Sequence, residues 1–497
     1  MEYYDFLAVE VDVVGSSKNE LFEINHLETG DVQVSVSKIS KKGNIKQTLL
    51  ERTFHPEETE EIRLFGIGGE DIFKIDGKGS GKIKLRLVSG EEPDSIVNNA
   101  LLPKKSQIIY QWEKERDHVV GGKGSKTILS EDESIFEYNR NAFRYEKRSP
   151  LPCFEYNADD GIYVGTGFQW VRHGFRKDPY RLMQSVKGNV AFMTGAFNFY
   201  FQGHAVDVLN SWDLEWNAEV LAPNYSNNFF GFGNETQGVG SEDNEKDFFR
   251  VRFNRVNLGA YLRREIGHLG HLSLGPVLEY TRLDDEDNES RFINNSTLSG
   301  LNTFEINQIK FYSGAQLNFE LDNRDNPKIP ARGLHFLTEM KHLEGLNSYS
   351  NSVTRINAEL SLYWTFKEVS RITWATRFGA GHTFGDFEFF QAQHLGGNTN
   401  FRGLRRFRFS GESVAFNNTE LRMRFNDLNF YILPLSTGML LFHDVGRVWW
   451  KEDNPRKWHR STGLGFWVAP LDQVVVTGIL GISEEEILPA ITFGFQF

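Results

Sequence analysis

The sequence is poor in cysteine and has no long apolar run. Cys153 is the one cysteine among 497 residues, so the chain forms no internal disulfide, and a single thiol supports no cysteine-based metal cluster. No stretch reaches the roughly 18 consecutive apolar residues of a transmembrane helix. This absence leaves a membrane-spanning β-barrel open, because barrel strands alternate between apolar and polar residues and keep the mean hydropathy low, here -0.43.

A basic excess is also missing. The net charge is -12 and the sequence pI is near 5.6, which argues against a nucleic-acid partner, because such proteins carry a basic face. The 13 histidines are scattered rather than spaced as metal ligands, and we find no serine–histidine or metallophosphatase motif. We therefore expect no catalytic residues, no metal and no cofactor, and we interpret the chain as a protein that is not an enzyme.

Aromatic residues and glycine are abundant instead. The chain has 42 Phe, 46 Gly and only 14 Pro, a composition typical of a many-stranded β protein. Short alternating segments such as 6–14, 32–37 and 82–87 predict a β-rich N-terminal domain over residues 1–98. Residues 99–150 are charged and rich in glycine, which favours a connector with at most local order.

From residue 151 to residue 497 the pattern becomes one of long strands and turns. We expect sixteen strands, at about 160–173, 182–194, 196–207, 210–222, 246–265, 269–284, 303–323, 333–346, 351–366, 370–385, 387–395, 413–427, 436–449, 461–470, 472–481 and 489–497. An even number of antiparallel strands, joined alternately by short turns and long loops, is the signature of an outer-membrane barrel. The predicted fold class is all-β: a C-terminal transmembrane antiparallel β-barrel of sixteen strands, preceded by a small β-rich domain.

The last predicted strand carries the clearest alternation. One face holds apolar residues and the other holds small or polar ones: Ile491, Phe493, Phe495 and Phe497 against Thr492, Gly494 and Gln496. An ordinary sandwich strand gives the same pattern. With the long strands before it, however, the apolar face predicts contact with lipid and the polar face a lumen. The terminal aromatic resembles the targeting signal that outer-membrane assembly machinery recognises, so we place the protein in the bacterial outer membrane, in contact with its lipid.

The first residues of the chain do not form a secretory signal peptide. Residues 1–6 contain no basic segment followed by an apolar one. An outer-membrane protein must be exported, so we expect that the signal was removed or that this chain is part of a longer polypeptide.

Two motifs resemble those of one family. Leu395–Leu404, with the sequence LGGNTNFRGL, resembles the lumen loop of the BamA and two-partner-secretion transporter superfamily, also called bacterial surface antigen barrels. That loop carries an Arg-Gly pair and folds back into the barrel. Phe442–Gly446, with the sequence FHDVG, resembles the family's Phe-x-Asp-x-Gly on a later strand. The order and spacing of the motifs make the resemblance specific, and it covers about residues 150–497.

The resemblance implies a lock between the loop and the barrel wall. In the family the loop arginine meets the Asp and the Phe of the later strand, which here implies that Arg402 contacts Asp444 and Phe442. These two lie on one strand face because they are two residues apart. A guanidinium in a lumen needs such partners, since an unpaired buried charge is costly.

The neighbours of this pair belong to the predicted lock. Gly403 is expected to let the loop turn tightly, and Gly446 to leave room for it. Phe401 and Leu404 depart from the family pattern, which more often has an aliphatic and an aromatic residue there. Asn418–Arg422 resembles the strand that follows the loop.

Glycines in the expected first barrel strand predict a weak seam. Gly161, Gly165 and Gly167 lie in the segment 160–173, and interior glycines weaken strand pairing. In the resembled family the first and last strands close the barrel at a seam that opens sideways, and we predict such a seam here. The alternative is that these glycines only make room for lumen side chains.

The N-terminal segment carries a second resemblance. It is similar to the β-rich region before the barrel in metallophosphatase–barrel fusion proteins of the Bacteroidetes type. Ile62–Phe73 also resembles a glycine-rich calcium repeat, but we find no second copy in the sequence and interpret it as a β-turn.

Three functions remain open at this point. The leading prediction is a barrel that assists the insertion or export of polypeptides together with other outer-membrane or periplasmic proteins. The second is a membrane anchor and exporter for a metallophosphatase whose catalytic domain is absent from this chain. The third is a passive channel, against which the lumen loop argues because it obstructs the pore.

Overall fold

The computed structural model describes residues 7–497 except 91, 104–105, 114–116, 123, 210, 239–246, 367–370, 426–427, 430–433 and 452–455. The chain divides into two units, Met1–Arg144 and Tyr145–Phe497. Among the described residues, no helix is long and apolar enough to cross a membrane.

The first unit consists of two β-sheets around one apolar core. Its strands are β1 (Glu10–Val14), β2 (Glu20–His26), β3 (Val32–Ile39), β4 (Ile45–Phe54), β5 (Glu61–Phe65), β6 (Ile72–Gly77), β7 (Lys84–Val88), β8 (Ser95–Asn98), β9 (Gln107–Trp112), β10 (His118–Gly121) and β11 (Lys126–Ser130). One sheet has the order β1-β5-β7-β9-β11 and the other β10-β8-β6-β2-β3-β4. The alternating strands bury one apolar face in each sheet, including Phe22, Ile24, Leu64, Phe73 and Leu87.

The chain of this unit winds as a coil that adds one strand to each sheet per turn. The strands β6, β8 and β10 are parallel and pair in register at an offset of 23 residues. A ladder of carboxylates repeats at the same offset: Asp94 accepts the backbone N–H of Asp71 (2.8 Å), and Asp117 accepts that of Asp94 (3.0 Å). The glycine-rich segment that we read as a single copy is therefore one coil of a structural repeat.

The connector expected over residues 99–150 differs from the structure. The strands β9, β10 and β11 and the short helix α2 (Glu133–Phe136) lie within it, and the first unit extends to Arg144. These strands have only four to six residues each. Their alternation is too short to stand out between charged loops, which is why the sequence reading missed them.

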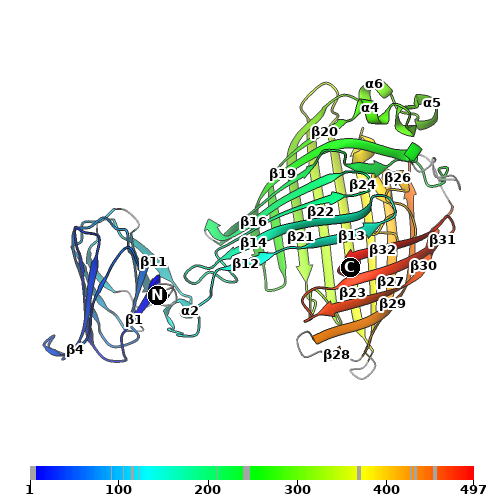
Figure 1. Cartoon of the computed structure of the whole chain (residues 1–497). Helices are drawn as coiled ribbons and strands as arrows, with labels where there is room; N and C mark the ends of the chain where they lie inside the picture. Colours follow the sequence, from blue (N-terminus) through cyan, green and yellow to red (C-terminus); the bar gives the residue numbers. More distant parts are fainter. Residues whose placement is uncertain are drawn as a thin grey trace. The chain divides into compact units, whose positions relative to one another are not determined.

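The second unit is a closed antiparallel barrel. Its segments are β12 (Lys147–Pro150), β13 (Cys153–Asn157), β14 (Gly161–Arg172), β15 (Leu182–Ala191), β16 (Phe197–Leu209), β17 (Trp212–Leu221), β18 (Ser226–Asn228), β19 (Arg250–Ile266), β20 (Gly270–Leu283), β21 (Lys310–Asp322), β22 (Gly333–Gly345), β23 (Val353–Thr365), β24 (Ile372–Gly385), β27 (Ser413–Arg424), β28 (Leu428–Asn429), β29 (Pro434–Trp449), β30 (His459–Pro470), β31 (Val476–Ser483) and β32 (Ile487–Phe493). Successive strands pair in chain order, and β13 closes the ring on β32 (Figure 1). The segments β12 and β13 both pair with β14, β17 and β18 both pair with β19, and β27 and β28 both pair with β29.

The prediction of sixteen strands is confirmed, although two of its members change. The pairs β12/β13, β17/β18 and β27/β28 are interrupted strands, so nineteen segments make sixteen strands. The first strand covers residues 147–157. We had placed residues 147–150 in the connector and begun the first strand only at about residue 160, because Pro150 and Pro152 interrupt the alternation. The predicted strand 387–395 instead contains the short helix η2 (Phe389–Gln391) and β25 (Gln393–Leu395), which lie outside the barrel sheet.

The two ends of the barrel have different connections. Short turns such as 267–269 and 471–475 join strands at one end, whereas 284–309 and 386–412 are long loops at the other. Short turns face the periplasm and long loops the cell exterior in outer-membrane barrels. The helices α4 (Asp285–Asn288), α5 (Ser296–Ser299) and α6 (Thr303–Ile306) lie in one of these extracellular loops (Figure 1).

The side chains of the wall separate into an apolar outside and a polar lumen. Outward positions expose large apolar side chains, such as Leu258, Leu274, Met340, Ile356, Phe378, Leu441 and Phe466. At the extracellular end, aromatic residues of three loops pack on lumen-facing residues of the wall as one apolar core, including Phe229, Phe230, Phe253, Phe292, Tyr312, Phe389 and Phe390. This core does not favour a permanently open diffusion channel.

The chain leaves its last strand earlier than predicted. β32 ends at Phe493, and Gly494 adopts a φ of +90°, which breaks the alternation that follows. The ring of Phe495 packs against Trp467, with centroids 5.5 Å apart. The guanidinium carbon of Arg422 lies 5.2 Å from the ring centroid of Phe497. Our prediction that Phe495 and Phe497 face lipid is therefore wrong, since both contact lumen side chains.

The carboxylate ladder of the first unit makes its stability depend on pH. Burial, together with nearby carboxylates, raises the pKa of Asp71 to about 8 and that of Asp94 to about 7. Burial lowers the pKa of His26 to about 4, so this imidazole is neutral in the folded and the unfolded chain above about pH 6.5.

The first unit should lose stability as the pH rises from 6.5 to 8. In this pH range Asp71 and Asp94 are protonated in the folded chain and already deprotonated in the unfolded chain. Because the folded state binds more protons, the free energy of unfolding decreases as the pH rises through the folded pKa values. We expect a loss on the order of 2 kcal/mol over this window. Pulse proteolysis of the intact chain in urea, scored by cleavage within residues 7–144, measures it. Asp71→Asn should flatten the slope, and a stability that rises with pH contradicts the prediction.

Candidate functional site: the lumen loop and its partners

The loop between β24 and β27 folds into the barrel interior. It contains η2, β25 and β26 (Phe409–Gly411), and β25 pairs with β26 as a small hairpin. Phe401 and Leu404, the two departures from the family pattern, are both buried in an apolar cluster that includes Leu395, Phe409, Phe416 and Val448. The loop thus has its own core, which holds it against the wall.

Arg402 is the central charge of this loop. Its side chain is 2% exposed, and its Nε and Nη2 donate to the two carboxylate oxygens of Asp444 at 2.9 and 2.6 Å. Its backbone N–H donates to the same carboxylate at 2.9 Å, and its Nη1 donates to Glu420. The guanidinium carbon lies 3.7 Å from the ring centroid of Phe442. The structure therefore brings the arginine together with the aspartate and the phenylalanine of β29.

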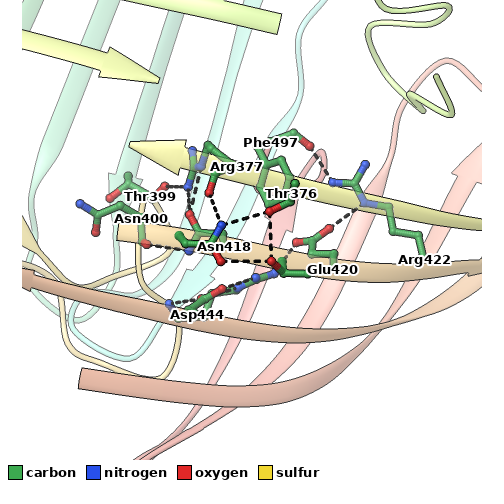
Figure 2. Close-up of polar contacts among 12 residues, drawn as sticks. Thr376, Arg377, Thr399, Asn400, Asn418, Glu420, Arg422, Asp444 and Phe497 are labelled. Carbon is green, nitrogen blue, oxygen red and sulfur yellow. Dashed lines mark hydrogen bonds and ion pairs between the residues drawn. The ribbon is translucent and has the colours of Figure 1, made fainter. Parts of the chain in front are cut away.

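The network continues from Arg402 to the end of the chain. Glu420 accepts from Nε of Arg422 at 2.6 Å, and Arg422 donates through Nη2 to the backbone oxygen of Phe497 at 2.7 Å (Figure 2). Glu420 and Arg422 lie on β27 two residues apart, so both face the lumen. The loop, the wall and the last residues are consequently joined by charge-assisted hydrogen bonds.

A second set of polar contacts holds the loop to β24 and β27. Arg377 donates to the side-chain oxygen of Asn418 (2.8 Å) and to the carbonyl of Thr399 (2.6 Å), while Asn418 donates to the carbonyl of Asn400 at 2.8 Å (Figure 2). Sequence reasoning noticed Asn418 only as part of a strand motif and missed Arg377. The polar residues at alternate positions of β27, Asn418, Glu420 and Arg422, were the signal from which their place in this network could have been predicted.

The two predicted glycines have different partners. Gly403 has a φ of +80°, and a Cβ there would lie 2.7 Å from Oγ of Ser461, so a larger residue would strain the loop and meet the wall. A Cβ at Gly446 would lie 2.6 Å from a methyl group of Leu395. Gly446 thus makes room for Leu395 at the start of the loop motif rather than for the Arg-Gly pair itself.

A fourth arginine, Arg405, joins two hairpins on either side of the seam. Arg405 donates to both carboxylate oxygens of Glu486 at 2.7 Å and to Asp159 at 3.2 Å. Glu486 lies in the turn between β31 and β32, and Asp159 in the turn between β13 and β14. Of these two turns, Arg408 contacts that between β31 and β32, through Glu485 at 2.7 Å, and it also donates to Thr236. The sequence reading identified none of these partners, because they lie 81 and 246 residues from Arg405.

The seam itself is weakly paired. Only Tyr156 and Ile491 are recorded as partners between β13 and β32. The glycines that we assigned to the first strand lie in the second strand, β14, which corrects the prediction. A Cβ at Gly165 or Gly167 would lie 2.2 or 2.1 Å from a backbone oxygen of β15, so these glycines serve a close strand approach.

One group of side chains in the lumen has the composition of a metal site. Glu320, Asp322 and His335 bring ligand atoms within 4.8 Å of one another. These atoms are engaged, since His335 contacts Glu320 at 2.8 Å and Asp322 accepts from Arg324 at 2.7 Å. The arrangement has the character of an ion-pair network that stiffens the lumen wall.

Comparisons with known proteins place this architecture. A family model described as the Omp85 superfamily domain matches residues 185–469. Among solved structures, BamA from Haemophilus ducreyi lacking POTRA domains 1–3 is similar, with 13% identity, coverage of 70% of each chain and a TM-score of 0.49. CdiB from Acinetobacter baumannii (11%, 75% of this chain, 62% of that chain, TM-score 0.46) and CdiB from Escherichia coli (10%, 75%, 65%, 0.45) are also similar. This chain spans less than two thirds of either CdiB. No curated protein matches the sequence.

Removal of the Arg402 charge should destabilise the barrel. Arg402→Ala leaves Asp444 and Glu420 buried without their cation, a change that costs about 3–5 kcal/mol when one partner of a buried pair is lost. Samples are incubated at increasing temperatures and then run on a gel, where the folded and the unfolded barrel migrate differently. The temperature at which the folded band disappears reports the unfolding of the barrel. Arg402→Lys keeps the charge but loses the bidentate geometry, so its unfolding temperature should lie between those of the wild type and Arg402→Ala. An alanine variant that unfolds at the wild-type temperature contradicts the lock.

Proposed function

The chain belongs to the Omp85 superfamily of outer-membrane β-barrels, and on this premise we propose that it assists the insertion or export of polypeptides through a seam between its first and last strands. Membership confirms the resemblance that the Arg-Gly and Phe-x-Asp-x-Gly motifs carried. The observation that carries the proposal is the contrast between the seam and the rest of the wall. One residue pair joins β13 and β32, whereas neighbouring strands such as β23 and β24 share thirteen.

A weak seam supplies a driving force that needs no nucleotide. An unpaired strand edge offers backbone N–H and C=O groups to an incoming strand, which gains hydrogen bonds by adding to the sheet. Its apolar side chains gain further stability when they enter lipid. A polypeptide with alternating strands is the substrate that such an edge recognises best.

We assign the lumen loop the role of a latch for this seam. Arg402 holds the loop to the wall, and Arg405 joins the hairpins β13–β14 and β31–β32 at the extracellular end. The charge pairs of Arg405 must break before these hairpins separate. The loop therefore sets the free energy of opening while the backbone pairing of the seam contributes little.

The first unit offers a surface for partner proteins. β4 is the edge of its six-stranded sheet, and the exposed fractions of Ile45 and Leu49 are 58% and 45%. An exposed edge strand with apolar side chains is suited to pair with an extended segment of another protein. We propose that outer-membrane or periplasmic partners or clients bind along β4.

Covalent closure of the seam should stop the activity. Tyr156→Cys with Ile491→Cys, in a Cys153→Ser background, places two thiols at the one recorded seam pair. The assay is insertion of a small reporter barrel into liposomes that contain the full chain. We expect at least a tenfold lower rate after oxidation and recovery after reduction, because a tethered seam has no free edge.

A matched tether controls for the crosslink itself. Thr376→Cys with Thr419→Cys joins β24 to β27, whose side-chain hydroxyls are 3.0 Å apart, in the closed part of the wall. This pair should leave the insertion rate unchanged. Full activity of the oxidised seam variant would show that the seam does not open during function.

Loss of the Arg405 bridge should make the seam open more often. Arg405→Gln removes the charge pairs to both hairpins, and we expect several-fold more frequent opening events in planar bilayers. Arg408→Gln is the control, because Arg408 contacts Glu485 and Thr236 but no residue of the β13–β14 turn among its recorded partners. Equal event frequencies in the two variants count against a latch at Arg405.

A further inference from the structure

Three alanines form a trough on the outer wall of the barrel. Ala358 on β23, Ala380 on β24 and Ala415 on β27 are direct partners in the strand register, and Arg447 on β29 continues the same row. The row faces outward, since it occupies the positions that alternate with lumen residues such as Asp444. Methyl groups in a row leave space that larger side chains fill elsewhere on this wall.

Bulky apolar side chains border the trough. Leu360, Phe378 and Val445 lie in the adjacent outward row, which ends at Arg460 on β30. The hollow has a volume of about 370 Å³, and its lining also includes Phe336, Trp458, Asn417, Phe416, Gly379 and Glu359. Two parallel rows thus lead from an apolar hollow to two arginines on neighbouring strands.

Arg447 is a buried charge in need of an anion. Its guanidinium carbon lies 4.5 Å from the ring centroid of Trp449 and 5.1 Å from that of Trp458. Its side chain is 8% exposed, and its Nε and Nη2 have no hydrogen-bond partner among the residues that the structure describes. A buried charge without a partner is costly, so an anion that reaches this guanidinium would bind favourably.

Arg460 adds a second positive charge at the same place. It pairs with Val445 and is therefore the diagonal neighbour of Arg447 across the strand pair, within reach of a long side chain. Arg460 is exposed. The carboxylate of Glu484 interacts electrostatically with Arg460, but it is already paired with Lys457 at 2.7 Å. Among the described residues, both arginines thus remain available to one anionic group.

The trough lies in the extracellular half of the membrane. β29 ends at Trp449, two residues beyond Arg447, and continues into an extracellular loop. Ala415 is two residues from the extracellular start of β27. Trp449 and Trp458 occupy the level at which barrels carry their aromatic girdle, where lipid headgroups begin. Arg447 and its register partner Ala415 therefore lie close to headgroup level. Ala380, five residues before the end of β24 at Gly385, and Ala358, five residues after the start of β23 at Val353, lie deeper, at the level of the acyl chains.

We propose that this trough binds a lipid of the outer leaflet that carries a phosphate headgroup. One acyl chain lies along the alanine row, and the phosphate contacts Arg447 and Arg460. Acyl chains fit this surface better than a polypeptide does. The amide of Asn417 beside the trough already donates to Thr376 and to the carbonyl of Arg377 at 3.0 Å each. A peptide backbone would therefore leave its polar groups without partners in the hydrocarbon layer.

Native mass spectrometry of the full chain in detergent tests the proposal. The probe is lipid A with two phosphates, compared with the same lipid after removal of both phosphates. We expect one tightly retained phosphorylated lipid and at least tenfold weaker binding of the dephosphorylated form. Arg447→Gln should weaken binding of the phosphorylated lipid about tenfold, and Ala415→Leu should abolish it by filling the trough.

Matched variants elsewhere on the wall serve as controls. Arg264 on β19 is exposed and its guanidinium carbon lies 5.5 Å from the ring centroid of Trp212, but it is not beside the trough, whose lining does not include it. Arg264→Gln and Ala260→Leu should therefore bind the lipid like the wild type. Heat-dependent gel migration verifies that each variant is folded, and Arg460→Gln replaces Arg447→Gln if that variant does not fold.

Several outcomes would overturn the proposal. Equal affinity for the phosphorylated and dephosphorylated lipids removes the role of the arginines. Unchanged binding by folded Ala415→Leu places the lipid elsewhere. Displacement of the lipid by millimolar inorganic phosphate alone shows an anion site without an acyl chain. A dimer of the chain that excludes lipid and is broken by Ala415→Leu assigns the trough to a second copy.

Discussion

The buried pair between Arg402 and Asp444 constrains the whole interior of the barrel. Neither charge is tolerable alone at this depth, so the loop and the wall must reach their final places together. Glu420 accepts from the same arginine and also pairs with Arg422, which holds the backbone oxygen of Phe497. These contacts connect the loop to the last residue of the chain, so a displacement of Arg402 should also shift Arg422 and Phe497.

Backbone pairing is extensive between neighbouring strands of the wall, such as β23 and β24, but not between the first and last strands. Between β13 and β32 the recorded backbone register is a single pair, and side-chain charges on Arg405 join the adjacent hairpins instead. Arg405 is 5% exposed, so breaking its ion pairs leaves buried charges without their partners, which is costly. Charged side chains pair with one another in the lumen, whereas on the outer wall they are unfavourable because lipid excludes charge. Arg447 on that wall is buried, and its Nε and Nη2 have no hydrogen-bond partner among the described residues, which points to a ligand rather than to structure.

Much of the site could be predicted because its signals are local. Phe442 and Asp444 are two residues apart on one strand, and a lumen arginine needs a carboxylate wherever it lies. The strand count was also readable from alternation. Two assignments failed for physical reasons: Pro150 interrupts the first strand, and the positive φ of Gly494 turns Phe495 away from lipid. The contacts of Arg405 gave no local signal at all.

The sequence by itself determined that the chain forms alternating strands with an apolar and a polar face, and that Arg402 needs an acidic partner. Both follow from short-range chemistry, the period of two in a strand and the cost of a buried charge. Only the tertiary structure decided which strands meet at the seam, which hairpins Arg405 joins and which alanines line up beside Arg447. These depend on register between residues far apart in the chain, and ring closure sets that register for all strands at once.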